Sequence, residues 1–99
     1  MDFKVIWTDP AIESLREIVQ AIAADNNSAA QRLGLELVER MEITTQFPRI
    51  GPLSSEDGAA EIRCLTHGNY RLCYRLGKVP GHAEVVAVRH SAREQPEFS

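Results

Sequence analysis

The residues best suited to grip an anion are arginines in the second half of the chain. In the stretch GNYRLCYR at 68–75, Arg71 and Arg75 alternate with aromatic and apolar residues. If this stretch is extended, both arginines share one face with Cys73, and the other face lies against a core. A guanidinium can form two parallel hydrogen bonds to a phosphate or a carboxylate. The same arginines would also serve simply to solvate an exposed sheet and discourage edge aggregation.

Further basic residues lie close to this stretch in the expected fold. Arg63 can approach Arg71 and Arg75 across a hairpin, and Arg89 and Arg93 lie at the end of the last expected strand. The candidates for contact with a target are therefore Arg63, Arg71, Arg75, Arg89 and Arg93. His90 has an unperturbed pKa of about 6.5, which suits proton transfer near neutral pH. The candidates for a catalytic role are Arg71, His90 and Arg93, although a histidine that ends a strand is more often a packed or capping residue.

Other familiar chemistries lack their residue patterns. The serines have no adjacent histidine and acid that would mark a triad, and no phosphate-binding glycine loop is present. Cys64 and Cys73 have no C-x-x-C spacing, and the three histidines are scattered. We therefore expect no metal and no cofactor. The two cysteines are expected to face each other on neighbouring strands as reduced, packed thiols.

Length and composition favour one ordinary globular domain over residues 1–99. Hydrophobic residues make up 43% and charged residues 25% of the chain. No apolar run approaches the roughly 20 residues that cross a bilayer. Because MDFKVIWTDP has an acid at residue 2 and only a brief apolar run, we expect no secretory signal there. We therefore expect a cytoplasmic protein with no membrane partner.

The formal net charge of −3 conceals a gradient along the chain. Residues 1–60 hold 5 basic and 10 acidic residues, whereas residues 61–99 hold 6 basic and 4 acidic residues and all 3 histidines. This asymmetry favours a partner for the basic half. The excess is too small for a protein that coats a polyanion.

Hydrophobic periodicity predicts the elements that carry these residues. Residues 2–7 alternate as a strand, and TDP at 8–10 supplies a helix start, because Thr8 or Asp9 can cap and Pro10 suits the first turn. That helix is expected to stop near Ala24. After the polar link DNNS, a second helix is expected over 28–46, and so short a link forces an antiparallel hairpin.

The second half of the chain changes to the period of strands. FPRIGPLSSEDG at 47–58 is expected to form an irregular loop, because its prolines and glycines break regular structure. Three strands of an antiparallel meander follow, at 60–66, 70–77 and 83–89, with HGN at 67–69 as a tight connection. The expected fold is α+β in the order β-α-α-β-β-β. A helical hairpin packs on one face of a small antiparallel sheet to which the N-terminal strand is added.

This order, together with FPRIG, NYRLCYR and VAVRHSARE, resembles the RelE/ParE family of toxins from bacterial type II toxin–antitoxin systems. The resemblance covers roughly residues 3–94 and is closer to the ParE-like branch, because RHSARE looks like the ending of ParE-like sequences. It implies growth arrest, a role in plasmid stabilisation, and neutralisation by a cognate antitoxin. It also implies no direct sequence-specific DNA binding by the toxin alone.

The family resemblance leaves two targets open. ParE-like members inhibit DNA gyrase without known enzymatic activity, whereas RelE-like members act with the ribosome as mRNA endonucleases. Arg71 matches a position that RelE-like nucleases use at the phosphate, but their preceding lysines and C-terminal tyrosine are missing here. We therefore expect a non-enzymatic gyrase inhibitor, with the ribosome-dependent nuclease as the alternative. A degenerate member that only binds an antitoxin is a third possibility.

Overall fold

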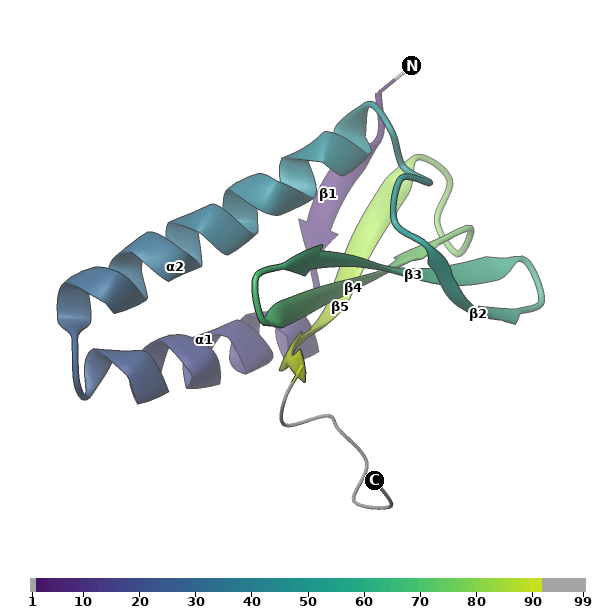
Figure 1. Ribbon diagram of the computed structural model, residues 1–99. Coiled ribbons are helices and arrows are strands. Elements are labelled where there is room, and N and C mark those ends of the chain that lie inside the picture. Colours follow the sequence, from purple (N-terminus) through teal and green to yellow (C-terminus); the bar gives the residue numbers. More distant parts are fainter. Residues whose placement is uncertain (1, 92–99) are drawn as a thin grey trace.

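The computed structural model describes residues 2–91, in which a helical hairpin packs against one face of a five-stranded sheet (Figure 1). The elements in chain order are β1 (Lys4–Trp7), α1 (Asp9–Ala23), α2 (Asn27–Met41), the 3-10 helix η1 (Glu42–Thr45), β2 (Leu53–Asp57), β3 (Ala60–His67), β4 (Tyr70–Leu76) and β5 (His82–His90). The α+β class and the packing of the hairpin on the sheet are as expected from the sequence. Neither helix of the described residues is long and apolar enough to span a membrane.

Helix α1 starts where the TDP sequence predicts. The Thr8 hydroxyl accepts a hydrogen bond from the Ala11 N–H at 3.4 Å, and Pro10 lies in the first turn, where its missing N–H costs nothing. The same hydroxyl donates to the Val85 carbonyl at 2.7 Å. One short side chain therefore caps the helix and ties it to β5.

Helix α2 is capped by Asn26, whose side chain accepts a hydrogen bond from the Ala29 N–H at 3.0 Å. It ends at Met41, earlier than the expected Gln46, and the chain narrows into η1. Thr44 and Thr45 donate their hydroxyls to the carbonyls three residues back, at 2.7 and 2.8 Å. These bonds accompany the tighter 3-10 turn, because they engage carbonyls that would otherwise accept bonds from a continuing α-helix.

The strand order is β1-β5-β4-β3-β2, and the last four strands in the sequence pair antiparallel. Strand β1 pairs parallel with β5, so the sheet is mixed and not purely antiparallel as expected. A parallel pair needs a long crossover. The helical hairpin and the other three strands provide it, because they lie between β1 and β5 in the chain.

Strand β2 lies in the segment that we expected to be an irregular loop. It pairs with β3 at the edge of the sheet, with a register shift between Leu53 and Ser55. Its sequence LSSED lacks the alternation of a half-buried strand, because residues 53–56 are exposed and such an edge strand needs no apolar side. Hydrophobic periodicity therefore cannot reveal this strand.

A bulge interrupts the pairing of β4 with β5. Cys73 lies opposite Ala87 and Tyr74 lies opposite Val85, so Val86 is the extra residue. The bulge changes the alternation of β5, and it lets Val85 and Val88 both face the core although they are three residues apart.

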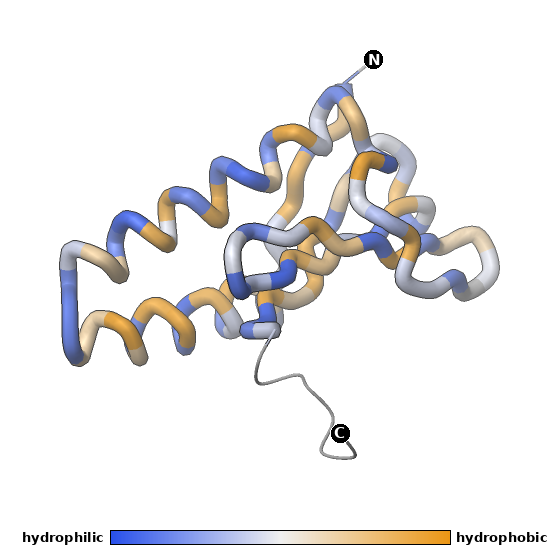
Figure 2. Tube along the Cα trace, viewed as in Figure 1, coloured by the Kyte–Doolittle hydropathy of each residue, from blue (hydrophilic) through white to orange (hydrophobic). Residues whose placement is uncertain are grey.

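The core lies between the helices and the facing side of β3, β4 and β5. Leu72, Tyr74 and Leu76 are at most 1% exposed, which confirms that alternate residues of β4 face the helices. Tyr70 packs at the margin of this cluster. Polar and apolar residues alternate along α2 in Figure 2, as expected for a helix with one buried side. The helices contribute Ala11, Leu37 and Met41 to the core.

Candidate functional site

Two arginines lie side by side on the face of the sheet opposite the helices. Arg71 of β4 is directly opposite Arg89 of β5, and on its other side it is opposite Thr66 of β3. Directly opposed residues of neighbouring strands point to the same face, so these three side chains form a row across the sheet. We call Thr66, Arg71 and Arg89 the arginine row.

The arginine row has the chemistry of an anion-binding surface. Arg71 and Arg89 are direct neighbours, so a phosphate or carboxylate at this face can contact both guanidinium groups. Guanidinium groups suit such anions because each offers a planar pair of donors. Arg89 is exposed and Arg71 is half-buried, so both side chains of the row are open to solvent to some degree.

Arg75 shares this face, but its charge is matched within the fold. Its Nε donates to Glu84 Oε1 at 2.9 Å, and the two residues are direct partners across β4 and β5. The side chains are 25% and 14% exposed. Arg75 therefore supports the sheet next to the arginine row, and its charge is less available to a partner than that of the exposed Arg89.

Arg63 does not join the arginine row, contrary to our expectation. It is directly opposite Tyr74, so it points to the helix side of the sheet. There its Nη1 donates to the carbonyls of Gly51 at 2.9 Å and Arg49 at 3.2 Å. Its Nε donates to Glu61 Oε1 at 2.9 Å. Arg63 thus holds the FPRIG segment onto the sheet.

Tyr74 completes this attachment from the core. Its hydroxyl donates to the Pro48 carbonyl at 2.7 Å and accepts from the Gly51 N–H at 3.0 Å. Burial raises the pKa of Tyr74, although the bond from Gly51 opposes that shift. We call Arg49, Gly51, Glu61, Arg63 and Tyr74 the FPRIG clamp.

Glu61 lies between the two arginines of the clamp. Arg49 contacts its carboxylate at 3.1 Å and Arg63 at 2.9 Å. Their hydrogen bonds, that from Arg49 first, hold the pKa of Glu61 below its ordinary value of 4.5. The acid therefore remains a carboxylate and keeps both arginines in place.

The clamp presents an apolar surface that sequence reasoning missed. Phe47, Ile50 and Leu53 are 58%, 44% and 46% exposed, although the backbone between them is held at several points. Large apolar side chains that are exposed on a fixed segment are typical of contact surfaces. The signal in the sequence was the apolar content of FPRIGPL, which the prolines and glycine led us to treat only as a break.

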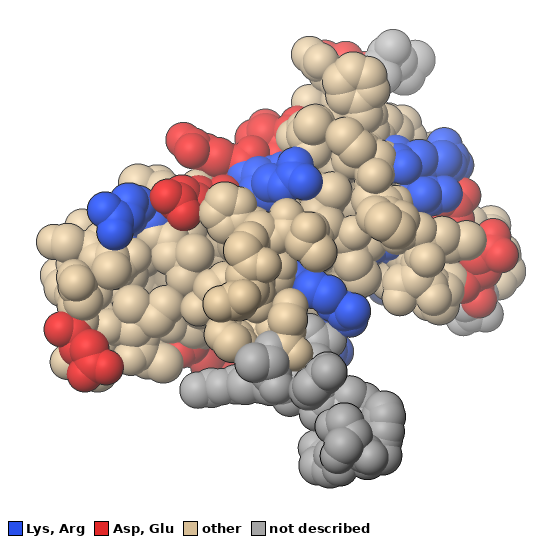
Figure 3. Space-filling model, viewed as in Figure 1, with Lys and Arg blue, Asp and Glu red and all other residues tan. Residues whose placement is uncertain are grey.

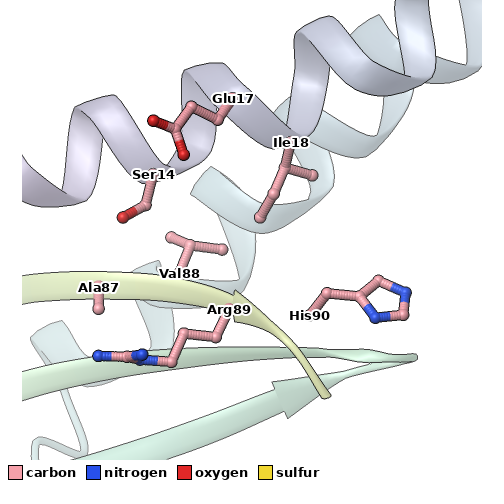
Figure 4. Close-up of a pocket in the computed structure, with 7 residues that line it drawn as sticks. All are labelled: Ser14, Glu17, Ile18, Ala87, Val88, Arg89 and His90. Atoms are coloured by element: carbon pink, nitrogen blue, oxygen red, sulfur yellow. The ribbon is translucent and has the colours of Figure 1, made fainter. Parts of the chain in front are cut away.

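His90 lies on the helix side of the sheet, away from the arginine row. Its ring meets that of Tyr70 edge-on, with centroids 4.9 Å apart and planes at 90°. Figure 4 shows the Arg89 and His90 side chains pointing away from each other at the end of β5. His90 therefore cannot exchange a proton at a group bound by Arg71 without a change of fold. The remaining catalytic candidate, Arg93, lies outside the described residues.

A groove runs between α1 and the ends of β4 and β5. Toward the edge of β5 it holds a cavity of about 390 Å³ lined by Ser14, Glu17, Ile18, Ala87, Val88, Arg89 and His90 (Figure 4). Toward the tip of the hairpin it holds a more apolar cavity of about 520 Å³. We call the apolar part, formed by Ile18, Ala21, Ile22, Tyr70 and His90, the α1 groove.

The charges of the described residues are mixed. Basic and acidic side chains are interspersed on the face drawn in Figure 3 and are not gathered into one basic patch there. Within residues 2–91, no group of three or more histidines, cysteines or acids is placed to hold a metal ion. The chemistry that the arrangement supports best is contact with a partner through a few arginines and apolar side chains.

Comparison with known proteins gives a family match over most of the chain. The family described as "ParE toxin of type II toxin-antitoxin system, parDE" matches residues 5–95. Among curated proteins, none matches this sequence.

Solved structures of two related kinds share the fold. This chain is similar to a chain in the structure of the chromosomal ParDE system of P. aeruginosa, with a TM-score of 0.73 and 16% sequence identity. The match covers 89% of this chain and 95% of the P. aeruginosa chain. This chain is similar to one from the RelBE2 toxin–antitoxin complex of Mycobacterium tuberculosis, with a TM-score of 0.64, 19% identity, and coverage of 91% and 99%. It is also similar to one from the archaeal RelE–RelB complex of Pyrococcus horikoshii OT3, with a TM-score of 0.64, 13% identity, and coverage of 94% and 99%.

Proposed function

Because the chain belongs to the ParE toxin family of type II toxin–antitoxin systems, we propose that it binds and inhibits DNA gyrase and is neutralised by a cognate antitoxin. The toxin acts by contact and not by cleaving a substrate. Arg71 and Arg89 contribute the charged part of the target contact. The ParDE system of P. aeruginosa has the same fold, which agrees with the proposal without identifying the target.

The observation that carries this proposal is the separation of Arg71 from His90 by the sheet. Arg71 lies on the face opposite the helices, and His90 packs against Tyr70 on the helix side. A nuclease needs its proton-transfer group within hydrogen-bond reach of the reacting atoms that its cations hold. An arginine row without that neighbour is better suited to binding than to catalysis.

The charge of the protein also favours gyrase over the ribosome. A net charge of −3 opposes binding within ribosomal RNA, where attraction to phosphates dominates affinity. A protein target can be recognised by the few arginines and apolar residues present here. Contact with gyrase therefore requires no broad basic surface.

Gyrase supercoiling and cleavage-complex assays with the purified chain test the proposal. We expect inhibition, and we expect Arg71→Ala and Arg89→Ala each to require roughly tenfold more protein, since a hydrogen bond to a charged group contributes about 1.5–3 kcal/mol. Lys78→Ala is the matched control, because Lys78 is exposed in the β4–β5 connection. Absence of inhibition at saturating protein would overturn the gyrase proposal.

The alternative is a RelE-like endonuclease that cleaves mRNA on the ribosome. The position of Arg71 in β4, together with the fold shared with two RelE complexes, is the observation in its favour. Primer extension on a translated message distinguishes the two activities. Cuts positioned by codon and lost in Arg71→Ala would establish the nuclease. If expression of the chain leaves bacterial growth unaffected, that result favours a degenerate family member that only binds an antitoxin over both the gyrase inhibitor and the nuclease.

We further propose that the antitoxin places apolar side chains in the α1 groove. Ile18 and Ile22 are half-buried there and Ala21 is exposed, so a partner can cover them without rearranging the core. Ala21→Arg should weaken antitoxin binding at least roughly tenfold, because it places a charge in the apolar contact. Gln20→Arg, on the adjacent exposed position, should leave binding unchanged. Equal effects of both variants in a calorimetric titration would refute this location.

A further inference from the structure

The two cysteines of the chain meet across the β3–β4 hairpin, and no part of the proposed function uses them. Cys64 and Cys73 are direct partners in the ladder, and their Sγ atoms are 2.7 Å apart in an S–H···S contact. This confirms the expectation that they face each other on neighbouring strands. Both lie on the face of the sheet that carries the arginine row, with Cys73 between Arg71 and Arg75 on β4.

The backbone around Cys64 brings these side chains as close as an antiparallel sheet allows. The Cys64 N–H donates to the Pro52 carbonyl at 3.2 Å, so its backbone groups point toward β2 and away from β4. Cys64 and Cys73 therefore form a non-hydrogen-bonded pair. In such pairs the Cα atoms approach to about 4.5 Å and the side chains are closest. That spacing falls at the short end of the range of about 4.4–6.8 Å that a disulfide can bridge.

The two thiols differ in their access to solvent. Cys73 is 7% exposed, whereas Cys64 is half-buried and lies nearer the edge of the sheet. A reagent in solution therefore reaches the Cys64 sulfur first. Cys73 is placed to react only with a group already attached to Cys64.

We propose that Cys64 and Cys73 form a redox-active dithiol that a small disulfide of the glutathione class oxidises to an intramolecular disulfide. The Cys64 thiolate attacks one sulfur of oxidised glutathione, forms a mixed disulfide and releases one glutathione thiolate. Cys73 then loses its proton and attacks the Cys64 sulfur, which forms the Cys64–Cys73 bond and releases the second glutathione. The two cysteines lose two electrons and two protons, and the oxidant is reduced to two thiols.

This linkage serves as a reversible switch. Because Cys64 is half-buried and not sealed in the core, a thiol reductant can reach the bond, and exposed disulfides are typically the labile, regulatory ones. It would also join β3 to β4 between Arg71 and Arg75. The chemistry holds whether the target is gyrase or the ribosome, so it stands apart from the proposed function.

The test is to expose the purified full chain to oxidised glutathione and measure intact mass and thiol labelling. The wild type should lose the mass of two hydrogen atoms, retain no adduct, and recover both thiols when reduced. Cys73→Ser should stop at a stable glutathione adduct on Cys64. Cys64→Ser should react at least roughly tenfold more slowly, because Cys73 is 7% exposed.

Three results would overturn the proposal. They are a lasting glutathione adduct on the wild type, equal reaction rates of the two serine variants, and no reaction of the wild type. Circular dichroism of each variant establishes that it is folded before the rates are compared. A thermal melt gives a second readout, because closing the hairpin with a bond should raise the Tm of the oxidised wild type by several degrees and leave Cys73→Ser unchanged.

Discussion

The arginines on the two sides of the sheet have different surroundings. In the FPRIG clamp, Arg49 and Arg63 share the carboxylate of Glu61, and Arg63 also binds two backbone carbonyls. In the arginine row, Arg71 and Arg89 lie beside each other across β4 and β5. The clamp arginines hold the protein's own loop, whereas we propose that the arginine row contacts a partner. Residue type alone does not distinguish these roles, because the face on which each side chain emerges decides them.

The largest expected effect on stability comes from adding a side-chain atom at Gly51, where the FPRIG clamp leaves no room for it. In Gly51→Ala the added Cβ would lie 2.9 Å from the Cys64 carbonyl oxygen and 2.9 Å from the Tyr74 hydroxyl. The backbone oxygen cannot move aside cheaply, so we expect a loss of about 3 kcal/mol in the free energy of unfolding. Urea denaturation measures it.

The matched control is Gly34→Ala in α2, where the new Cβ would meet Val19 Cγ2 at an ordinary 3.5 Å. Alanine favours a helix interior, so this variant should be about 0.5–1 kcal/mol more stable than the wild type. Equal stability of Gly51→Ala and the wild type would show that the clamp is not tightly packed.

A smaller effect separates the two groups of arginines directly. Arg63→Ala removes bonds to two carbonyls and to Glu61 from a side chain that is 16% exposed, and should lower the free energy of unfolding by about 2 kcal/mol. Arg89→Ala should change it by less than about 0.5 kcal/mol, because an exposed charge beside another cation contributes little. Denaturation together with the gyrase assay checks both variants.

The two variants should differ in opposite ways in their free energy of unfolding and in their inhibition of gyrase. Arg63→Ala should lose stability and, at a temperature where it is folded, keep its inhibition, whereas Arg89→Ala should do the reverse. If both variants lose stability equally, the distinction between clamp and row does not hold.

The smallest expected effect is a pH dependence of the folding stability that arises from Glu61 in the FPRIG clamp. Because the pKa of Glu61 is lowered in the folded state, its stabilisation is complete above the ordinary value of 4.5 and is lost as the pH falls through the lower folded pKa. The effect is small because Arg49 is 60% exposed and solvent screens surface ion pairs. Glu61→Gln should flatten this part of the stability profile, measured as urea midpoints between pH 5 and pH 3 at roughly half-unit steps. Arg89→Ala should retain it, and loss of the slope in that variant would contradict the assignment.

The sequence carried enough information for most of the fold. Thr8 and Pro10 marked the start of α1, and the alternation of β4 identified Leu72 and Tyr74 as core residues. Both features depend on local backbone chemistry or on burial, which leave a pattern in the residues. Strand β2 left none, because its pairing uses backbone groups and the side chains of residues 53–56 are exposed on an edge.

Arg63 was predicted on the wrong face of the sheet because the expected hairpin turn was one residue too long. We expected a three-residue connection at 67–69, but His67 pairs with Tyr70 and only Gly68 and Asn69 form the turn. Gly68 has a φ of +60°, which suits the first central position of a two-residue hairpin turn. Since side chains alternate along a strand, this one-residue difference moves Arg63 from the arginine row to the clamp.

The bulge at Val86 gives the last strand one residue more than its pairing with β4 requires. Val85 and Val88 both reach the core because one residue between them is not paired. In evolutionary terms, a single deletion at 86 or 87 would remove the bulge and leave Arg89 opposite Arg71 and His90 opposite Tyr70. Descendants of this chain can therefore lose one residue from this strand without exchanging the faces of Arg89 and His90.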